Sequence, residues 1–234
     1  MALLYVRNDG SNTSPYDTWA KAATTLATAL NSTSAGDTVY VADGHTESAS
    51  ADVSIDNNEA HTDAPVSVLC VNDVGDPEPP TALATGAHVE ADVTGNFDLR
   101  FTEGAYYVYG IDFSCGRGLF ISRDAQIFEQ CSFDFGGDGN ANGIMELGVE
   151  AADPTGHEFI NCTFVLNNVN QEIRAFSAHA LFRGCTFFAT GTVPTYALQF
   201  IGSGDVEFFG CDFSACTNNV FHLPYRGMRG STLG

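Results

Sequence analysis

The chain has 234 residues, with 9 Lys and Arg against 29 Asp and Glu, so its formal net charge is -20. Charged residues make up only 16% of the sequence, and Lys21 is the only lysine. Binding to nucleic-acid phosphates or to an anionic membrane surface needs clustered cations, so both kinds of partner are excluded. A hydrophobic share of 44% is enough for a folded core, and no apolar run is long enough to span a membrane.

The N-terminal part predicts one helix followed by short strands. Residues 17–30 predict a helix capped by Asp17, because Trp19, Ala23 and Leu26 fall on one stripe at helical spacing. We expect this amphipathic helix to cover the open edge of the first strands. Alternating apolar and polar residues between turn residues predict strands at 36–44, 51–57, 65–72, 88–92 and 97–104.

A six-residue repeat organises the rest of the chain. Its first position is apolar, its third is Gly, Gln or Asn, and its sixth is always Phe. Apolar fourth and sixth positions around a polar fifth predict a strand with one buried face. A third position that favours Gly and Asn predicts a turn with positive φ. The five copies are VYGIDF (108–113), FEQCSF (128–133), FINCTF (159–164), FRGCTF (182–187) and FFGCDF (208–213).

The repeat assigns structural roles to three sets of residues. We expect the sixth-position rings to form one buried stack and the third-position residues to make the turns. The fourth-position cysteines should point inward, one per coil. These sets are Phe113, Phe133, Phe164, Phe187 and Phe213; Asn161, Gly184 and Gly210; and Cys131, Cys162, Cys185 and Cys211.

Strands that return every twenty to thirty-one residues stack in parallel, about 4.8 Å apart. The sequence therefore predicts an all-β solenoid, a parallel β-helix of roughly eight coils in which each coil pairs with its neighbours. The alternative fold, a β-sandwich, would not explain why the same six-residue repeat occurs five times. We divide the chain into 1–35, an N-terminal strand and capping helix; 36–223, the parallel β-helix; and 224–234, a C-terminal tail or the start of a continuation.

The opening of the chain carries a resemblance to a known group. YVRNDGSN (5–12), TWAKAATTLATAL (18–30) and AGDTVYVADG (35–44) resemble, in this order, the start of right-handed parallel β-helix proteins of the pectate-lyase-like class. The later repeats resemble the rungs of that class. The resemblance implies a right-handed parallel β-helix. The class includes polysaccharide lyases and hydrolases, surface adhesins and tailed-bacteriophage virion proteins.

The cysteine column favours free thiols over disulfides. A Cβ separation of about 4.8 Å along the column exceeds the roughly 3.5–4.5 Å that a disulfide needs. A column also does not converge on one point, as metal ligands do. We therefore interpret these cysteines as small hydrophobic residues in a tight corner. Local pairing among Cys115, Cys211 and Cys216 is left open.

Candidate catalytic carboxylates are few. Asp112 and Asp134 lie one coil apart and are the candidates for a glycosidase pair, provided that both point outward. Glu158 and Glu207 occupy equivalent positions in the repeat but lie two coils apart. Solvated surface acids explain the same residues.

Lyase and metal chemistry have weaker candidates. Arg123 and Arg174 are the candidate bases of a polysaccharide lyase, but no three aspartates on adjacent coils accompany either. Asp138, Asn140 and Asn142 match the first half of a calcium loop, and the second half lacks the required Glu. A Gly- and Asn-rich turn explains that loop without metal. No other cofactor is implied.

These observations favour a non-enzymatic structural protein of a bacteriophage virion. We expect it to be made in the host cytoplasm, where thiols stay reduced, and to lie on the virion exterior as a capsid decoration or a tail spike component. The resemblance implies a homotrimer bound to other virion proteins, with Arg226 and Arg229 as contact residues. The alternatives are a depolymerase, lyase or glycoside hydrolase, that cuts a host surface polysaccharide, and a carbohydrate-binding adhesin without turnover.

Overall fold

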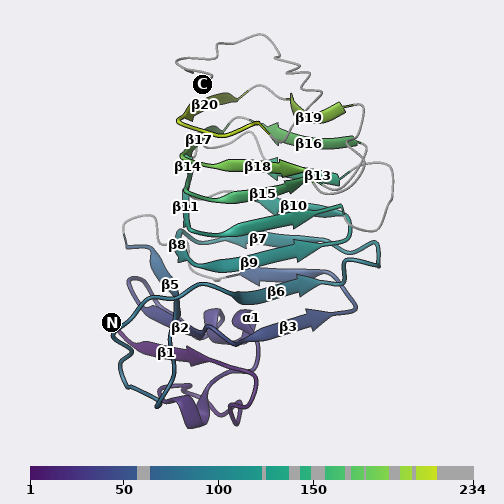
Figure 1. Cartoon of the computed structure of the whole chain (residues 1–234). Helices are drawn as coiled ribbons and strands as arrows, with labels where there is room; N and C mark the ends of the chain where they lie inside the picture. Colours follow the sequence, from purple (N-terminus) through teal and green to yellow (C-terminus); the bar gives the residue numbers. More distant parts are fainter. Residues whose placement is uncertain are drawn as a thin grey trace.

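The fold is a stack of parallel strands, shown in Figure 1. The computed structural model describes residues 1–56, 64–122, 125–136, 143–148, 156–166, 170–176, 178–189, 196–201 and 204–214. In these ranges the named strands form one eight-stranded and two six-stranded sheets. Every strand of a sheet pairs with strands one circuit before or after it in the chain, which is the arrangement of a parallel β-helix.

One circuit illustrates why the repeat produces this fold. Strand β8 (Tyr106–Tyr109) ends at Gly110, which turns the chain with a φ of 76°. Strand β9 (Ile111–Cys115) follows in the second sheet, and β10 (Gly118–Ile121) follows in the third. The alternation of the repeat buries Ile111 and Phe113 on the inner face of β9. The predicted parallel solenoid is confirmed; its handedness and number of coils stay predictions.

The three sheets are named A, B and C in the order in which each circuit visits them. Sheet A contains β1 (Leu3–Val6), β2 (Thr38–Ala42), β5 (Val66–Val71), β8, β11 (Gln126–Glu129), β14 (Gly156–Ile160), β17 (His179–Arg183) and β20 (Asp205–Phe209). Sheet B contains β3 (Thr46–Ala49), β6 (Ala87–Ala91), β9, β12 (Ser132–Phe135), β15 (Thr163–Leu166) and β18 (Thr186–Ala189). Sheet C contains β4 (Val53–Asp56), β7 (Leu99–Glu103), β10, β13 (Gly143–Leu147), β16 (Asn170–Ala175) and β19 (Tyr196–Ile201).

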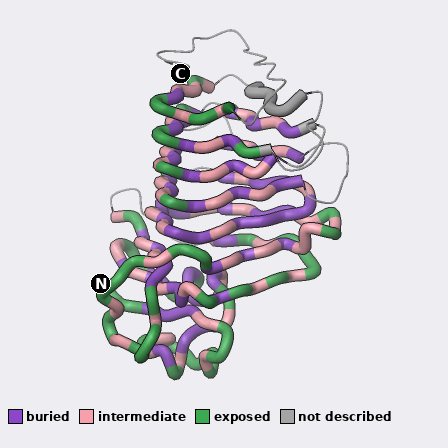
Figure 2. Tube along the Cα trace, in the orientation of Figure 1, coloured by how far each residue is buried: buried purple, intermediate pink, exposed green. Residues whose placement is uncertain are grey.

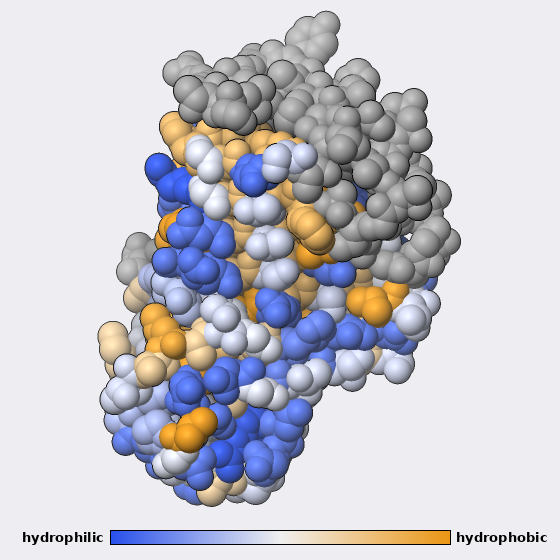
Figure 3. All heavy atoms as spheres, in the orientation of Figure 1, coloured by the Kyte–Doolittle hydropathy of each residue, from blue (hydrophilic) through white to orange (hydrophobic). Residues whose placement is uncertain are grey.

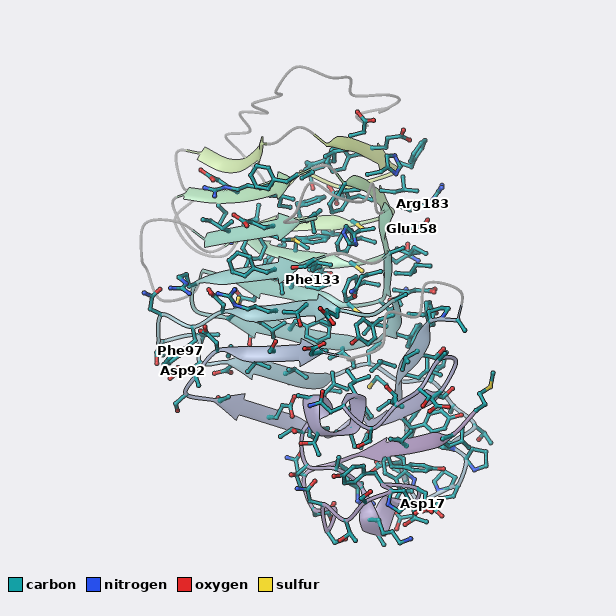
Figure 4. The ribbon with its side chains drawn as sticks, turned by 180° about the vertical axis from the view of Figure 1, so that it is seen from behind. Asp17, Asp92, Phe97, Phe133, Glu158 and Arg183 are labelled. Carbon is teal, nitrogen blue, oxygen red and sulfur yellow. The ribbon has the colours of Figure 1, made fainter. Side chains whose placement is uncertain are left out.

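Two columns of stacked phenylalanines run through the core, beside many buried aliphatic side chains. Figure 2 marks the buried positions along the strands. In the sheet B column, Phe133 stacks on Phe164 at 5.2 Å between ring centroids, and Phe164 stacks on Phe187 at 4.9 Å. Phe133 lies inside the stack of strands in Figure 4. The ends of this column are Phe113 and the partly buried Phe213. The sheet A column is formed by Phe128, Phe159, Phe182 and Phe208.

The turn between sheets A and B has the backbone that the third repeat position implies. Asn161, Gly184 and Gly210 have φ values of 51°, 60° and 61°, and Gln130 has 55°. A left-handed residue at each of these points lets two short strands meet at a sharp corner. Side chains other than Gly, Asn or Asp rarely accept this conformation, which explains the composition of the third position.

The cysteines lie just after this turn and are free thiols. Cys162 donates a weak hydrogen bond from Sγ to the carbonyl of Phe128, and Cys185 donates one to the carbonyl of Phe159. Cys131 and Cys211 make the same contact with the preceding circuit. Three of the four are buried, and Cys211 is partly exposed. Cys216 lies outside the described residues.

The N-terminal helix differs from the prediction of one helix over 17–30. The segment forms a 3₁₀ turn, η1 (Trp19–Lys21), and a five-residue helix, α1 (Leu26–Leu30). Thr18 and Thr25 cap the two pieces, because each hydroxyl accepts a backbone N–H three residues later. Asp17, at the bottom of Figure 4, instead pairs with Lys21 at 2.9 Å. Helix α1 packs against β1, β2 and β4; its capping role stays a prediction.

Candidate functional site

The outer face of sheet B gathers most of the candidate residues into two rows that cross the strands. Side chains alternate along each strand, so residues paired in register on successive strands share a row. The face lies at the front of Figure 3, where it is hydrophilic over β3, β6 and β9. The His88 row contains Thr46, His88, Asp112, Ser132, Thr163, Thr186 and Asp212, and the Glu90 row contains Ser48, Glu90, Ser114, Asp134, Val165 and Phe188.

His88 is the centre of a hydrogen-bonded cluster in these rows. Its Nε2 lies 2.9 Å from the hydroxyl oxygen of Ser114 and 3.4 Å from a carboxylate oxygen of Glu90. The other carboxylate oxygen of Glu90 accepts a hydrogen bond from the hydroxyl of Ser48 at 3.2 Å. A serine nucleophile needs an imidazole that contacts serine through one nitrogen and an acid through the other. Here Nε2 faces both partners, so the geometry does not support a serine nucleophile.

Asp112 is the half-buried carboxyl group beside this cluster. Burial raises the pKa of Asp112, and the nearby His88, whose positive charge acts in the opposite direction, does not cancel that effect. A carboxyl group with a raised pKa keeps its proton to higher pH. It can then donate that proton to a leaving oxygen, which is the task of a general acid.

Asp134 stands diagonally across from Asp112 on the next strand. Asp112 pairs in register with Ser132, and Asp134 pairs with Ser114, so both carboxylates lie on the outer face. One strand spacing and two residues along the strand separate their Cα atoms by about 8 Å. Side chains on one face of a sheet stand roughly parallel, so carboxyl groups at this Cα separation reach the roughly 6.5–9.5 Å of inverting glycosidases more readily than the roughly 5–5.5 Å of retaining ones.

The two rows end in features that suit a linear ligand. At one end Phe188 exposes 47% of its surface, two strands beyond Asp134. At the other end, beside the edge strand β3, a pocket of about 250 Å³ opens next to Glu90. Neither row contains Lys or Arg. The face thus offers carboxylates, hydroxyls and one aromatic ring across six successive strands.

The other sequence candidates lie elsewhere. Glu158 and Glu207 project from the outer face of sheet A with Leu181 between them in register. Arg183 donates to Glu158 at 2.7 Å, and this exposed pair is seen at the edge of Figure 4. Glu158 is paired with Arg183 and lies two strands from Glu207, so the two glutamates do not form a catalytic pair.

Arg174, a candidate lyase base, lies on sheet C between two carboxylates. It contacts Glu146 at 3.2 Å and Glu172 at 2.5 Å, so its charge is compensated within the sheet. Asp98, which directly precedes β7 in the same sheet, is fully buried and forms ion pairs with Arg100 and Arg117. Sheet C therefore carries balanced ion pairs.

Several candidates fall outside the described residues. These are Arg123, the calcium-loop residues Asp138, Asn140 and Asn142, and the contact residues Arg226 and Arg229. Among the residues that the structure describes, no group of three His, Cys, Asp or Glu side chains could hold a metal ion. Within the same ranges, no helix is long and apolar enough to cross a membrane.

Sequence reasoning missed His88, Glu90 and Ser114. The strand at 88–92 was expected, but it was not aligned with the strand of the first repeat. The sequence did contain the necessary pattern. HVEA (88–91) has the same alternation of outward and inward positions as DFSC (112–115), so His88 corresponds to Asp112 and Glu90 to Ser114. Extending the repeat by one circuit toward the N-terminus would have placed His88 beside Asp112.

Comparisons with known proteins bear on the fold. No protein-family model and no curated protein sequence matches the chain. Among solved structures, an alginate lyase from Paenibacillus sp. strain FPU-7 is similar over 84% of this chain and 94% of its own, with a TM-score of 0.34 and 13% identity. At this level the similarity assigns no substrate and no residue role.

The comparison nevertheless corrects one expectation. The solved structure is named as an alginate lyase, which falls under the lyase alternative stated above and not under a structural virion component. The prediction of a non-enzymatic virion protein is therefore wrong and is not carried further. The parallel sheets agree with the β-helix of the pectate-lyase-like class.

Proposed function

We propose that the chain is a polysaccharide depolymerase that binds a glycan along the outer face of sheet B. The observation that carries this proposal is the pair of outward carboxylates, Asp112 and Asp134, on adjacent strands. Burial raises the pKa of Asp112, so this carboxyl group keeps its proton to higher pH than an exposed aspartate and suits the acid role.

The chemistry that fits is hydrolysis with inversion. Asp112, protonated, donates its proton to the glycosidic oxygen, and the bond from that oxygen to the anomeric carbon breaks. Asp134, ionised, removes a proton from a water molecule that attacks the anomeric carbon from the opposite face. His88 is a positioning residue, because its contact with Ser114 joins β6 to β9 beside Asp112, while its contact with Glu90 lies within β6.

Charge favours hydrolysis over lyase chemistry at this face. A lyase that acts on uronic acids must neutralise the substrate carboxylate before a proton can leave the neighbouring carbon. The two rows supply Glu90, Asp112 and Asp134 and contain no Lys or Arg. A uronate would be repelled there, whereas a neutral or cationic glycan would not.

The test is a panel of neutral, acidic and amino-group-containing polysaccharides incubated with the purified chain. We expect new reducing ends and a falling molecular mass for at least one neutral or cationic glycan, with loss of activity in Asp112→Asn and Asp134→Asn. Glu158→Gln, at a partly exposed glutamate on sheet A, is the matched control and should stay active. Products with the ultraviolet absorbance of an unsaturated uronate would replace hydrolysis by a lyase reaction. No cleavage of any polymer would reject the proposal.

A further inference from the structure

The edge pocket is the concave site at the end of sheet B, lined by Thr25, Ala27, Glu47, Ser48, Ala49, Asp52, Val53, Ser54 and Glu90. It lies where the start of α1 meets the corner between β3 and β4. Its volume of about 250 Å³ is slightly below the range of drug-sized pockets, so it suits a single small unit such as one sugar ring. Three alanine and valine side chains supply an apolar wall, and three hydroxyls supply hydrogen-bond partners.

The charged side chains that line the edge pocket are three carboxylates, and no Lys or Arg belongs to the lining. Arg100, outside the lining, lies 4.0 Å from Asp52 but pairs more closely, at 2.5 Å, with the buried Asp98. Protein groups hold those carboxylates in place: Glu47 accepts from the backbone N–H of Leu26 at 2.9 Å, and Asp52 accepts from that of Asp98 at 3.0 Å. Carboxylates fixed around a small cavity favour a ligand that brings positive charge and hydroxyl groups.

A metal ion is a poor fit for the same pocket. The described residues contain no group of three acidic, Cys or His side chains placed to hold one. The carboxylates are instead spread around a cavity that has an apolar wall. A ring with an apolar face, several hydroxyls and an ammonium group matches all three features, and an amino sugar with a free amine has that chemistry.

We infer that the edge pocket is a subsite for a hexosamine residue with a free amino group. The inference rests on the proposed function, because Glu90 belongs both to the pocket and to the row that contains Asp134. A glycan bound in the pocket therefore continues across β6 and β9 to the carboxylate pair. The substrate class is then a polysaccharide with unacetylated amino sugars, and the net charge of -20 helps to attract it.

The test measures binding separately from cleavage, by calorimetry on the Asp112→Asn protein. The probes are a fully deacetylated glucosamine trimer and its N-acetylated counterpart at low salt. We expect the deacetylated trimer to bind roughly tenfold or more tightly than the acetylated one, and the preference to shrink as salt is raised. Ala27→Phe, which fills the pocket, and Glu90→Gln, which removes one charge, should each abolish the preference. Glu158→Gln should keep it.

The outcomes separate the two proposals. Equal binding of the two trimers, or a preference unchanged in Ala27→Phe and Glu90→Gln, overturns the amino-sugar subsite. Cleavage of a neutral glycan by the wild-type chain together with equal trimer binding would remove the subsite and leave the depolymerase. A pocket-dependent preference without cleavage of any polymer would leave the subsite and make the chain a binding protein.

Discussion

Nε2 of His88 lies 2.9 Å from the hydroxyl oxygen of Ser114, and this contact bridges adjacent strands of sheet B. It fixes the imidazole next to Asp112, which pairs in register with His88. The positive charge of a protonated His88 would lower the pKa of Asp112, but burial raises it by more. The result is a carboxyl group that is protonated more readily than an exposed aspartate, on a face where Asp134 is its diagonal neighbour.

Asp112→Asn separates catalytic from structural importance. The raised pKa means that the carboxyl ionises less readily in the folded than in the unfolded chain, so its charge costs folding stability as the pH rises above the unfolded pKa. We therefore expect Asp112→Asn to keep or raise the free energy of unfolding at pH 7, measured in urea. Activity on the cleaved glycan should fall by about 10²–10⁴-fold, the usual contribution of a general acid. A large loss of stability would make Asp112 a structural residue.

Phe164→Ala tests the sheet B column of stacked rings. Phe164 is fully buried between Phe133 and Phe187, so its removal leaves a cavity in the middle of the column. The free energy of unfolding should fall by about 3–5 kcal/mol. Phe188→Ala, at an exposed position on the neighbouring strand β18, should cost less than about 1 kcal/mol. Similar costs for both would contradict the packing described above.

Gly184→Val tests the corner between sheets A and B. Gly184 has a φ of 60°, and a Cβ there would meet Oδ1 of Asn161 at 2.4 Å. A β-branched side chain fits this backbone region badly, so we expect a loss of several kcal/mol or no folded protein. Gly156→Ala is the control, because its Cβ would have no neighbour closer than 4.0 Å. Thermal unfolding of both variants compares them directly; equal melting temperatures would show that the corner tolerates side chains.

The burial of His157 should make the free energy of unfolding depend on pH. Burial lowers the pKa of His157 from 6.5 to about 4, and neither ring nitrogen has a hydrogen-bond partner. Between these values the unfolded chain binds the proton more readily, so stability must fall as the pH is lowered. The contribution is about 3 kcal/mol across this window. Urea unfolding from pH 7 to pH 4 should therefore destabilise the wild-type chain more than His157→Gln; parallel curves would contradict the burial of His157.

The sequence predicted the strands of sheets A and B better than those of sheet C. The repeat spans one corner, so it located the turn at Asn161, Gly184 and Gly210 and the rings that stack behind it. Sheet C follows connections of variable length, and no common phrase marks its strands. The helix at 17–30 was predicted as continuous because helical spacing holds across it, yet Thr25 begins a new cap within it.

The candidate site was partly visible in the sequence. Asp112 and Asp134 were found because they belong to the repeat, whereas His88 and Glu90 precede its first copy. Their proximity to Asp112 depends on the register between β6 and β9, and the six-residue repeat does not reach β6. The edge pocket could not be predicted from the sequence. Its residues Thr25, Asp52 and Glu90 come together only when α1 packs against the first circuits.

A crystal structure of Asp112→Asn with an oligosaccharide of the cleaved polymer tests the central claim most directly. We predict a glycan that crosses the strands of sheet B on its outer face, with one ring in the edge pocket and the chain extending toward Phe188. The scissile oxygen should lie beside residue 112, with room for a water molecule at Asp134. A glycan bound to the outer face of sheet A or sheet C, with sheet B empty, would contradict the account.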